Sequence, residues 1–180
     1  FCQDDAHIFV AEDGMQSEMS TFMELVDEVY GDFGLTDVTV VVATRPEKRL
    51  GSDEIWDRAE KALMTAVDEK GRKYTVAPGE GAFYGPKIEL HVKDGLDRDW
   101  QLGTIQVDFA LPERFELEYV GADGARHRPV MLHRAIFGSL ERFFGVYLEH
   151  TGGAYPTWLS PVQAAILPIT DRAMAHADVV

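Results

Sequence analysis

Polar side chains alternate along the first ten residues, FCQDDAHIFV, at Gln3, Asp5 and His7. Successive side chains of an extended strand point to opposite faces, so one face would carry an amide, a carboxylate and an imidazole in a row. A second histidine, His133, occurs in MLHRAIFGSLERFFG. Taken alone, these ten residues slightly favour a solvated face with a structural histidine. The alternative is a strand that lines a binding site.

A glycine-rich segment, GEGAFYGPKIE, spans residues 79–89. Glycine lets the backbone approach a ligand closely and adopt positive φ angles. Tyr84 and Lys87 add a hydroxyl and a cation, which could meet a carboxylate or a phosphate. Such a loop is weak evidence by itself, because most glycine-rich loops are only turns.

The segment RDWQLGTIQVDF, residues 98–109, is expected to be a strand with Thr104, Gln106 and Asp108 on one face. Gln101 falls on the other face unless Gly103 marks a β-bulge, which would change the alternation. Glutamines close to Trp100 suggest a hydrogen-bonding role. Solvated polar residues on a half-buried strand are the alternative.

The segment HRAIFGSLERF, residues 133–143, is expected to be a strand end that turns into a helix. Ser139 lies near the junction, and Arg142 follows about one turn later. A guanidinium group matches phosphate in a planar fork, so this arrangement suits an anionic ligand. The alternative is that Glu141 and Arg142 form a solvated helix face, the commoner fate of such pairs.

Composition limits the possible functions. The chain has 180 residues, of which 46% are hydrophobic and 27% charged, and its net charge is −14. That acidity argues against a main role in clamping nucleic acid, which needs clustered Lys and Arg, so a polynucleotide contact would be local, as at RPEKR (45–49). One cysteine rules out an intramolecular disulfide framework and suits a reducing compartment. We therefore expect a cytoplasmic protein without a membrane segment.

Hydrophobic periodicity predicts an α+β fold, in which helices flank one side of an antiparallel sheet. The expected helices span 15–33, 52–70 and 135–150, and the expected strands 37–44, 87–93, 100–109 and a hairpin of 115–120 with 128–132. A linker at 151–161 precedes a further buried strand at 162–169. We expect one domain over 1–160 and the beginning of a second over 161–180. The chain begins in mid-strand and ends as a helix begins, so we expect an internal fragment of a larger protein.

Five segments occur in an order that resembles the catalytic domain of the threonyl-tRNA synthetase family, a group of class II aminoacyl-tRNA synthetases. They are QDDAHIF, TRPEKRLGSDEIWDRAE, GEGAFYGPKIE, WQLGTIQVDF and MLHRAIFGSLERF. The resemblance covers about residues 1–160, and their joint occurrence is far more specific than any one segment. The run PVQAAILPITD resembles the first strand of that family's anticodon-binding domain.

The resemblance implies a role for each candidate residue. His7 and His133 match two zinc-binding histidines, and the third protein ligand, a cysteine, would lie outside this chain; Cys2 is not a substitute. Zinc in this family binds the amino and hydroxyl groups of threonine, and Mg²⁺ accompanies ATP. Asp5 matches the family residue that engages the threonine hydroxyl, and Gln3 and Tyr84 match residues around the amino acid's polar atoms. Gln101, Thr104 and Gln106 match residues that contact ATP or the adenylate. Ser139 matches a residue of the pocket wall, and Arg142 resembles the arginine that binds the γ-phosphate. Arg142, Gln101 and Lys87 are the candidate catalytic residues.

The implied function is ATP-dependent activation of threonine and its transfer to tRNA(Thr) by a homodimer. Motif 1, the first half of motif 2 with its arginine, and the editing region do not match any part of this chain, so about half of the active site is represented. Two alternatives remain: a sister class II synthetase, such as one for proline or serine, and a non-catalytic paralogue that binds tRNA or regulates. The pair of histidines argues against the first, and the presence of Gln101, Thr104 and Arg142 argues against the second.

Overall fold

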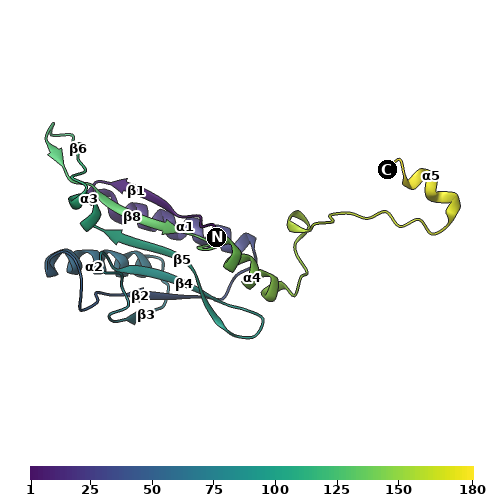
Figure 1. Ribbon diagram of the computed structural model, residues 1–180, viewed down its shortest axis with the longest axis horizontal. Coiled ribbons are helices and arrows are strands. Elements are labelled where there is room, and N and C mark those ends of the chain that lie inside the picture. The colour runs from purple at the N-terminus through teal and green to yellow at the C-terminus, as the bar shows by residue number, and fades with distance from the viewer.

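The computed structural model describes residues 1–180 and contains one six-stranded sheet with helices packed against it (Figure 1). Its strands are β1 (Ala6–Val10), β2 (Val38–Ala43), β3 (Tyr74–Ala77), β4 (Lys87–Lys93), β5 (Asp99–Asp108) and β8 (Val130–Ala135), in the spatial order β1-β8-β5-β4-β2-β3. Neighbouring strands are antiparallel except β2 and β3, which are parallel because a helix crosses over between them. The predicted α+β class is confirmed, with this parallel pair as an unpredicted addition.

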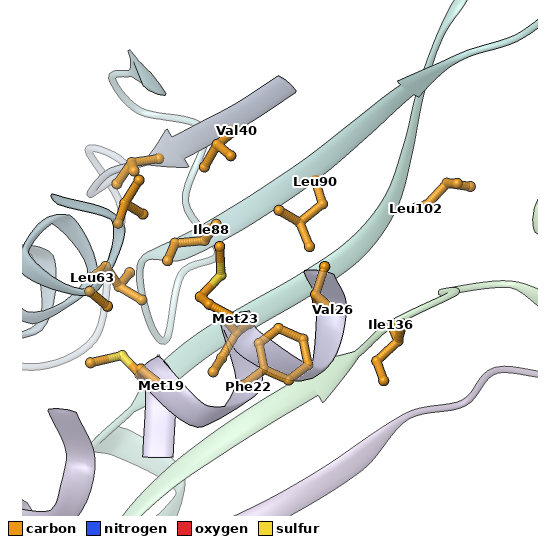
Figure 2. Close-up of a cluster of buried hydrophobic side chains, with 14 of the residues drawn as sticks. Met19, Phe22, Met23, Val26, Val40, Leu63, Ile88, Leu90, Leu102 and Ile136 are labelled. Atoms are coloured by element: carbon orange, nitrogen blue, oxygen red, sulfur yellow. The ribbon is translucent and has the colours of Figure 1, made fainter. Parts of the chain in front are cut away.

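Three long helices bury their apolar stripes: α1 (Met15–Asp32), α2 (Asp53–Glu69) and α4 (Leu140–Thr151). The first two begin and end within one residue of their predicted limits. The third was predicted to begin at 135 but begins at Leu140, because residue 135 still pairs in β8 and Ser139 caps the helix. Figure 2 shows the α1 side chains packed toward those of the sheet and of α2; Met19, Met23, Val26, Leu63, Ile88 and Leu90 have no exposed surface. The remaining helical segments are short: Glu12–Gly14, α3 (Ala110–Arg114), Thr157–Leu159, Asp171–Ala173 and α5 (Met174–Ala177).

The two faces of the sheet differ in chemistry. In β4, Ile88, Leu90 and Val92 are buried under the helices, whereas the alternate residues are partly or fully exposed. We call the helix-packed side the covered face and the other the open face. Register places four open-face residues in one row across four strands: His7, His133, Gln106 and Lys87.

A bulge in β5 explains the position of Gln101. The strand advances three residues between Gln101 and Thr104 while β4 advances only two between His91 and Glu89, their partners. Gln101 therefore returns to the open face, where its Nε2 donates to Thr104 Oγ1 at 2.9 Å. Of the two possibilities that the sequence left open for Gln101, the structure shows the one with a bulge. Glycine is required at 103, because a Cβ there would lie 2.8 Å from the Tyr30 hydroxyl and 2.9 Å from the Ile136 carbonyl oxygen.

The hairpin predicted over 115–132 is wrong in most of its extent. Only β6 (Tyr119–Val120) and β7 (Arg126–His127) pair with each other. Asp108 Oδ1 accepts hydrogen bonds from the backbone N–H groups of Ala110 and Leu111, so the chain turns into α3 there. Residues 130–135 instead form β8, which lies between β1 and β5 and buries Leu132.

The strand predicted at 162–169 is absent. Tyr155 and Leu159 still pack against the core, but the chain beyond Thr157–Leu159 projects away from the sheet (Figure 1). Leu167 and Ile169 are 83% and 98% exposed. An apolar run forms a strand only where another strand offers hydrogen-bond partners, and nothing in residues 1–180 pairs with this one. The domain boundary near residue 160 stays a prediction. No helix is long and apolar enough to cross a membrane.

Candidate functional site

A cavity of about 380 Å³ lies on the open face, beside the turn that leads from β8 into α4. It is formed by segments that are far apart in the sequence. Nine of the eleven candidate residues line it: Gln3, Asp5, Tyr84, Gln101, Thr104, Gln106, His133, Ser139 and Arg142. Register alone brings the strand residues together, since β1, β8 and β5 are direct neighbours.

The two candidate histidines face each other across β1 and β8. His7 and His133 are paired in register, and their ring centroids are 4.6 Å apart. Tyr84 lies on the other side of His133, with the two ring centroids 5.4 Å apart. No group of three or more His, Cys, Asp or Glu side chains is placed to hold a metal ion, so Cys2 does not complete such a site. The two imidazoles can supply two ligands.

The glycine-rich loop packs tightly on β5. Gly85 approaches so closely that a Cβ would lie 1.8 Å from the Val107 carbonyl oxygen. Gln106 Nε2 donates to the Gly85 carbonyl oxygen at 2.9 Å, which anchors the loop. Burial raises the pKa of the neighbouring Tyr84 hydroxyl, and the carboxylates of Asp108 and Asp5 add to the effect. Tyr84 therefore remains a neutral hydrogen-bond donor near pH 7.

Arg142 supplies a positive charge that no carboxylate neutralises. Ser139 caps α4 by accepting from the Arg142 backbone N–H at 3.2 Å. The guanidinium donates to the Gln101 carbonyl oxygen at 3.2 Å, and no acidic side chain lies within 4.0 Å of it. A guanidinium held by a neutral acceptor at a cavity wall can bind an anion such as phosphate.

Comparison with known protein families decides where this site belongs. Residues 1–151 match the profile of the tRNA synthetase class II core domain (G, H, P, S and T). The chain belongs to this family.

Within this family, the chain is most usefully compared with individual relatives of known name. The chain is 60% identical over 177 residues to a threonine--tRNA ligase of Methylococcus capsulatus and 59% identical over 180 residues to one of Delftia acidovorans. These matches cover 98% and 100% of this chain and 28% of each relative. The chain therefore spans little more than a quarter of the length of these curated relatives.

Solved structures agree with the sequence relatives. A structure described as the RNA binding domain of threonyl-tRNA synthetase from Cryptosporidium parvum superimposes with a TM-score of 0.92 at 46% identity, covering 98% of this chain and 44% of that one. A putative threonyl-tRNA synthetase from Aeropyrum pernix gives 0.80 at 32% identity, covering 99% and 43%. A histidyl-tRNA synthetase of S. aureus, at 18% identity and 0.56, shares the fold alone.

Two candidates of this synthetase core lie outside the cavity lining. His7 lies next to His133, which does line the cavity. Lys87 stands opposite Gln106 in register, but its ammonium group lies 2.6 Å from Glu89 Oε1. Its catalytic role stays a prediction.

The basic loop of residues 45–49 is largely neutralised by α2. Arg45 pairs with Glu60, at 2.7 Å, and with Asp57. These bonds, that to Glu60 first, raise the pKa of Arg45 far above its usual range. Arg49 pairs with Asp53 in the same way. Two of the loop's three cations thus serve the fold, which leaves Lys48 as the residue most available to a polynucleotide.

Sequence reasoning missed Asp4, which faces away from the cavity. Its carboxylate accepts hydrogen bonds from the backbone N–H groups of Ile136, Phe137 and Gly138, at 2.7, 3.2 and 2.9 Å. Asp4 thereby ties β1 to the turn that sets Ser139 and Arg142. The sequence does contain one indication of this role. Asp4 alternates with Gln3 and Asp5 and so points to the covered side, where a carboxylate must find hydrogen-bond partners.

The sequence indicates Asp108 only as a polar residue on a predicted strand. It is fully buried, and its Oδ2 lies 2.9 Å from His133 Nε2. The register of β5 and β8 was needed to see this contact, since 25 residues separate the two side chains.

Proposed function

We propose that this chain forms the part of a threonyl-tRNA synthetase that binds threonine and ATP for amino-acid activation. The observation that carries the proposal is the convergence of nine candidate residues on one cavity. They come from the segment just before β1, the glycine-rich loop, β5, β8, and the N-cap and first turn of α4, which are far apart in the sequence. Curated relatives at 60% and 59% identity, each named threonine--tRNA ligase, support the choice of amino acid.

The cavity divides into an amino-acid end and a nucleotide end. At the amino-acid end, Asp5, Gln3 and Tyr84 offer a carboxylate, an amide and a neutral hydroxyl to the polar groups of threonine. At the nucleotide end, Gln101 and Thr104 offer hydrogen bonds, and Gln106 borders both. Arg142 would contact the γ-phosphate of ATP, which enters with its Mg²⁺.

The reaction would proceed in two steps. The threonine carboxylate attacks the α-phosphate of ATP, giving threonyl-adenylate and pyrophosphate. The threonyl group then passes to a ribose hydroxyl at the end of tRNA(Thr). The residues of this chain act by holding reactants in line and stabilising developing charge, as Arg142 does at the leaving pyrophosphate, rather than by covalent chemistry.

His7 and His133 would hold a zinc ion as two of its protein ligands. Their adjacent rings on the open face fit that role, and a third ligand would come from outside this chain. When bound, zinc supplies open coordination positions for the amino and hydroxyl groups of threonine. A synthetase for proline has no substrate hydroxyl for such a site to bind, and the relatives named threonine--tRNA ligase favour threonine over serine. A non-catalytic paralogue has no need of an unneutralised Arg142. Both alternatives are therefore disfavoured.

The further partners belong to the same proposal. We expect a homodimer that binds tRNA(Thr) and works in the cytoplasm. By itself, the 180-residue chain should not catalyse threonine-dependent ATP–pyrophosphate exchange, because the motif 2 arginine and the third zinc ligand are outside it. Measurable pyrophosphate exchange by the chain alone would contradict the proposal that residues outside this chain complete the active site.

The test of the function uses a full-length synthetase that contains this chain. His133→Ala should abolish zinc binding and threonine activation together, because two remaining protein ligands are fewer than the three of a normal catalytic zinc site. Metal content by atomic emission is measured beside pyrophosphate exchange. The control is His127→Ala, an exposed histidine on β7, which should leave both unchanged. Full zinc occupancy in His133→Ala would contradict the proposed site.

A further inference from the structure

His133 is held from two sides on the open face. Across one strand boundary it faces His7, and across the other it faces β5, where Gln106 is its register partner. Asp108 follows Gln106 by two residues on the same face of β5, and its Oδ2 lies 2.9 Å from His133 Nε2. One ring nitrogen of His133 is therefore already engaged within the fold.

The Asp108 carboxylate has no freedom to turn away. Its side chain has no exposed surface, and its Oδ1 accepts from the N–H groups of Ala110 and Leu111 at 2.8 and 2.9 Å. Those two bonds fix the plane of the carboxylate at the beginning of α3. The second oxygen, Oδ2, then has His133 as its hydrogen-bond partner.

This geometry determines where the imidazole proton resides. An ionised carboxylate can only accept, so Nε2 must carry the hydrogen of the bond. A neutral imidazole has one N–H and one lone pair, which leaves the lone pair on Nδ1. A metal ligand needs that lone pair, and metal-bound histidines commonly donate their other N–H to a carboxylate.

We propose that Asp108 is a positioning residue that holds His133 in the Nε2–H tautomer and so reserves Nδ1 for the metal. The inference rests on the proposed function for the identity of the ligand, but the tautomer itself does not. His7 has no equivalent support, since its closest carboxylate, Asp5, is 3.9 Å away. The two histidines are thus unequal: one is oriented by the fold, and the other is oriented only when the site is filled.

Asp108→Asn reverses the hydrogen bond with little change of shape. The amide oxygen can still accept from Ala110 and Leu111, but the amide nitrogen now donates to Nε2. That exchange favours the Nδ1–H tautomer, in which Nδ1 has no lone pair for a metal. A residue that only supported the fold would not change the tautomer in this way.

The direct measurement is nitrogen NMR of histidine-labelled chain without metal, at a pH about two units above the usual histidine pKa of about 6.5. We expect the protonated-nitrogen signal of His133 on Nε2 in the parent and on Nδ1 in Asp108→Asn, with His7 unchanged. The His133 signals are assigned by their loss in His133→Gln. A parent protein with the proton on Nδ1 would overturn the proposal, even if the variant failed to fold.

Zinc affinity in a full-length synthetase containing this chain is the second measurement, made by chelator competition. Asp108→Asn should weaken zinc binding about 10- to 100-fold. The matched control is Asp99→Asn. It changes another Asp–His contact, that of Asp99 Oδ2 with His91 Nδ1 at 2.5 Å, and it should leave zinc affinity unchanged. Parent-like affinity in Asp108→Asn would contradict the role of Asp108 alone, provided that His133→Gln loses zinc. Zinc retained in His133→Gln would instead contradict the proposed metal site.

Discussion

The two faces of the central sheet are built from the same strands but serve different purposes. In β4, Leu90 has no exposed surface and packs under the helices, whereas the adjacent Glu89 lies on the open face among charged side chains. The covered face contributes stability through apolar burial. The open face contributes binding groups that stability does not require. Substitutions on one strand should therefore separate into two classes according to their parity.

The largest effect is expected on the covered face. Leu90→Ala removes a fully buried side chain at the centre of the sheet, and such cavities cost about 2–5 kcal/mol of unfolding free energy. Lys93→Ala, on the same strand but exposed, should change it by less than about 0.5 kcal/mol. Urea unfolding of both variants makes the comparison. Similar losses from the two would mean that the faces do not differ as described.

Arg142→Ala should produce the opposite pattern. Loss of a charge-assisted phosphate contact costs about 1.5–3 kcal/mol, or about 10- to 150-fold in binding. In a full-length synthetase containing this chain, we expect the KM for ATP to rise by that factor, while the KM for threonine and the unfolding midpoint change little. Equal losses for both substrates would identify a structural arginine instead.

Asp94 is an exception on the covered side, because it is a buried carboxylate at the β4–β5 turn. Burial by itself would raise its pKa. Hydrogen bonds from the Trp100 indole, from the backbone and side chain of Arg98 and from the Leu96 N–H outweigh burial, and they hold the pKa far below its usual range.

This depressed pKa predicts a pH-dependent contribution to stability. Because the folded-state value is lower than the unfolded value, the contribution is present above about pH 4 and is lost as the pH falls further. Asp94→Asn should be less stable than the parent at pH 7, and the gap should narrow between pH 4 and pH 2. A gap that stays constant over that range would show that ionisation of Asp94 does not matter.

Local patterns predicted α1, α2 and the central strands, and the end but not the beginning of α4. The stripe of α2 (Trp56, Ala59, Leu63, Ala66 and Val67) is buried throughout, because a helix orients its own side chains by its 3.6-residue period. The sequence offered a bulge at Gly103 as one of two possibilities for Gln101, and only the register of β4 and β5 decides between them. The alternation predicted for the first ten residues likewise placed Gln3 and Asp5 at the cavity, although β1 itself begins only at Ala6.

The errors concern features that depend on distant partners. The apolar residues at 162–169 resemble a strand but have no neighbour to pair with, and the hairpin over 115–132 gave way to α3 and β8. The positioning roles of Asp4 and Asp108 arise from contacts to residues 136–138 and 133, which register creates and local sequence does not reveal. The same holds for the parallel pairing of β3.

The separation of the faces predicts that the open face reads the substrate, and Asp5 is the residue on which that claim depends most. Valine is nearly isosteric with threonine, and an apolar pocket separates such pairs by only about 100-fold. A carboxylate that requires the hydroxyl would increase that ratio, because valine leaves it unpaired. Serine retains the hydroxyl and differs by one methyl group, worth about 1–3 kcal/mol.

The most direct measurement is kcat/KM for adenylate formation with threonine, valine and serine, in a full-length synthetase containing this chain and in its Asp5→Ala variant. Asp37→Ala, an exposed carboxylate outside the cavity, is the control. We predict that Asp5→Ala narrows the threonine-over-valine ratio by about 5- to 150-fold, the cost of a polar group that bound substrate covers and leaves without a hydrogen-bond partner. The threonine-over-serine ratio should stay nearly unchanged. If the Asp5→Ala variant rejected valine as strongly as the parent, Asp5 would not be the residue of the open face that recognises the threonine hydroxyl.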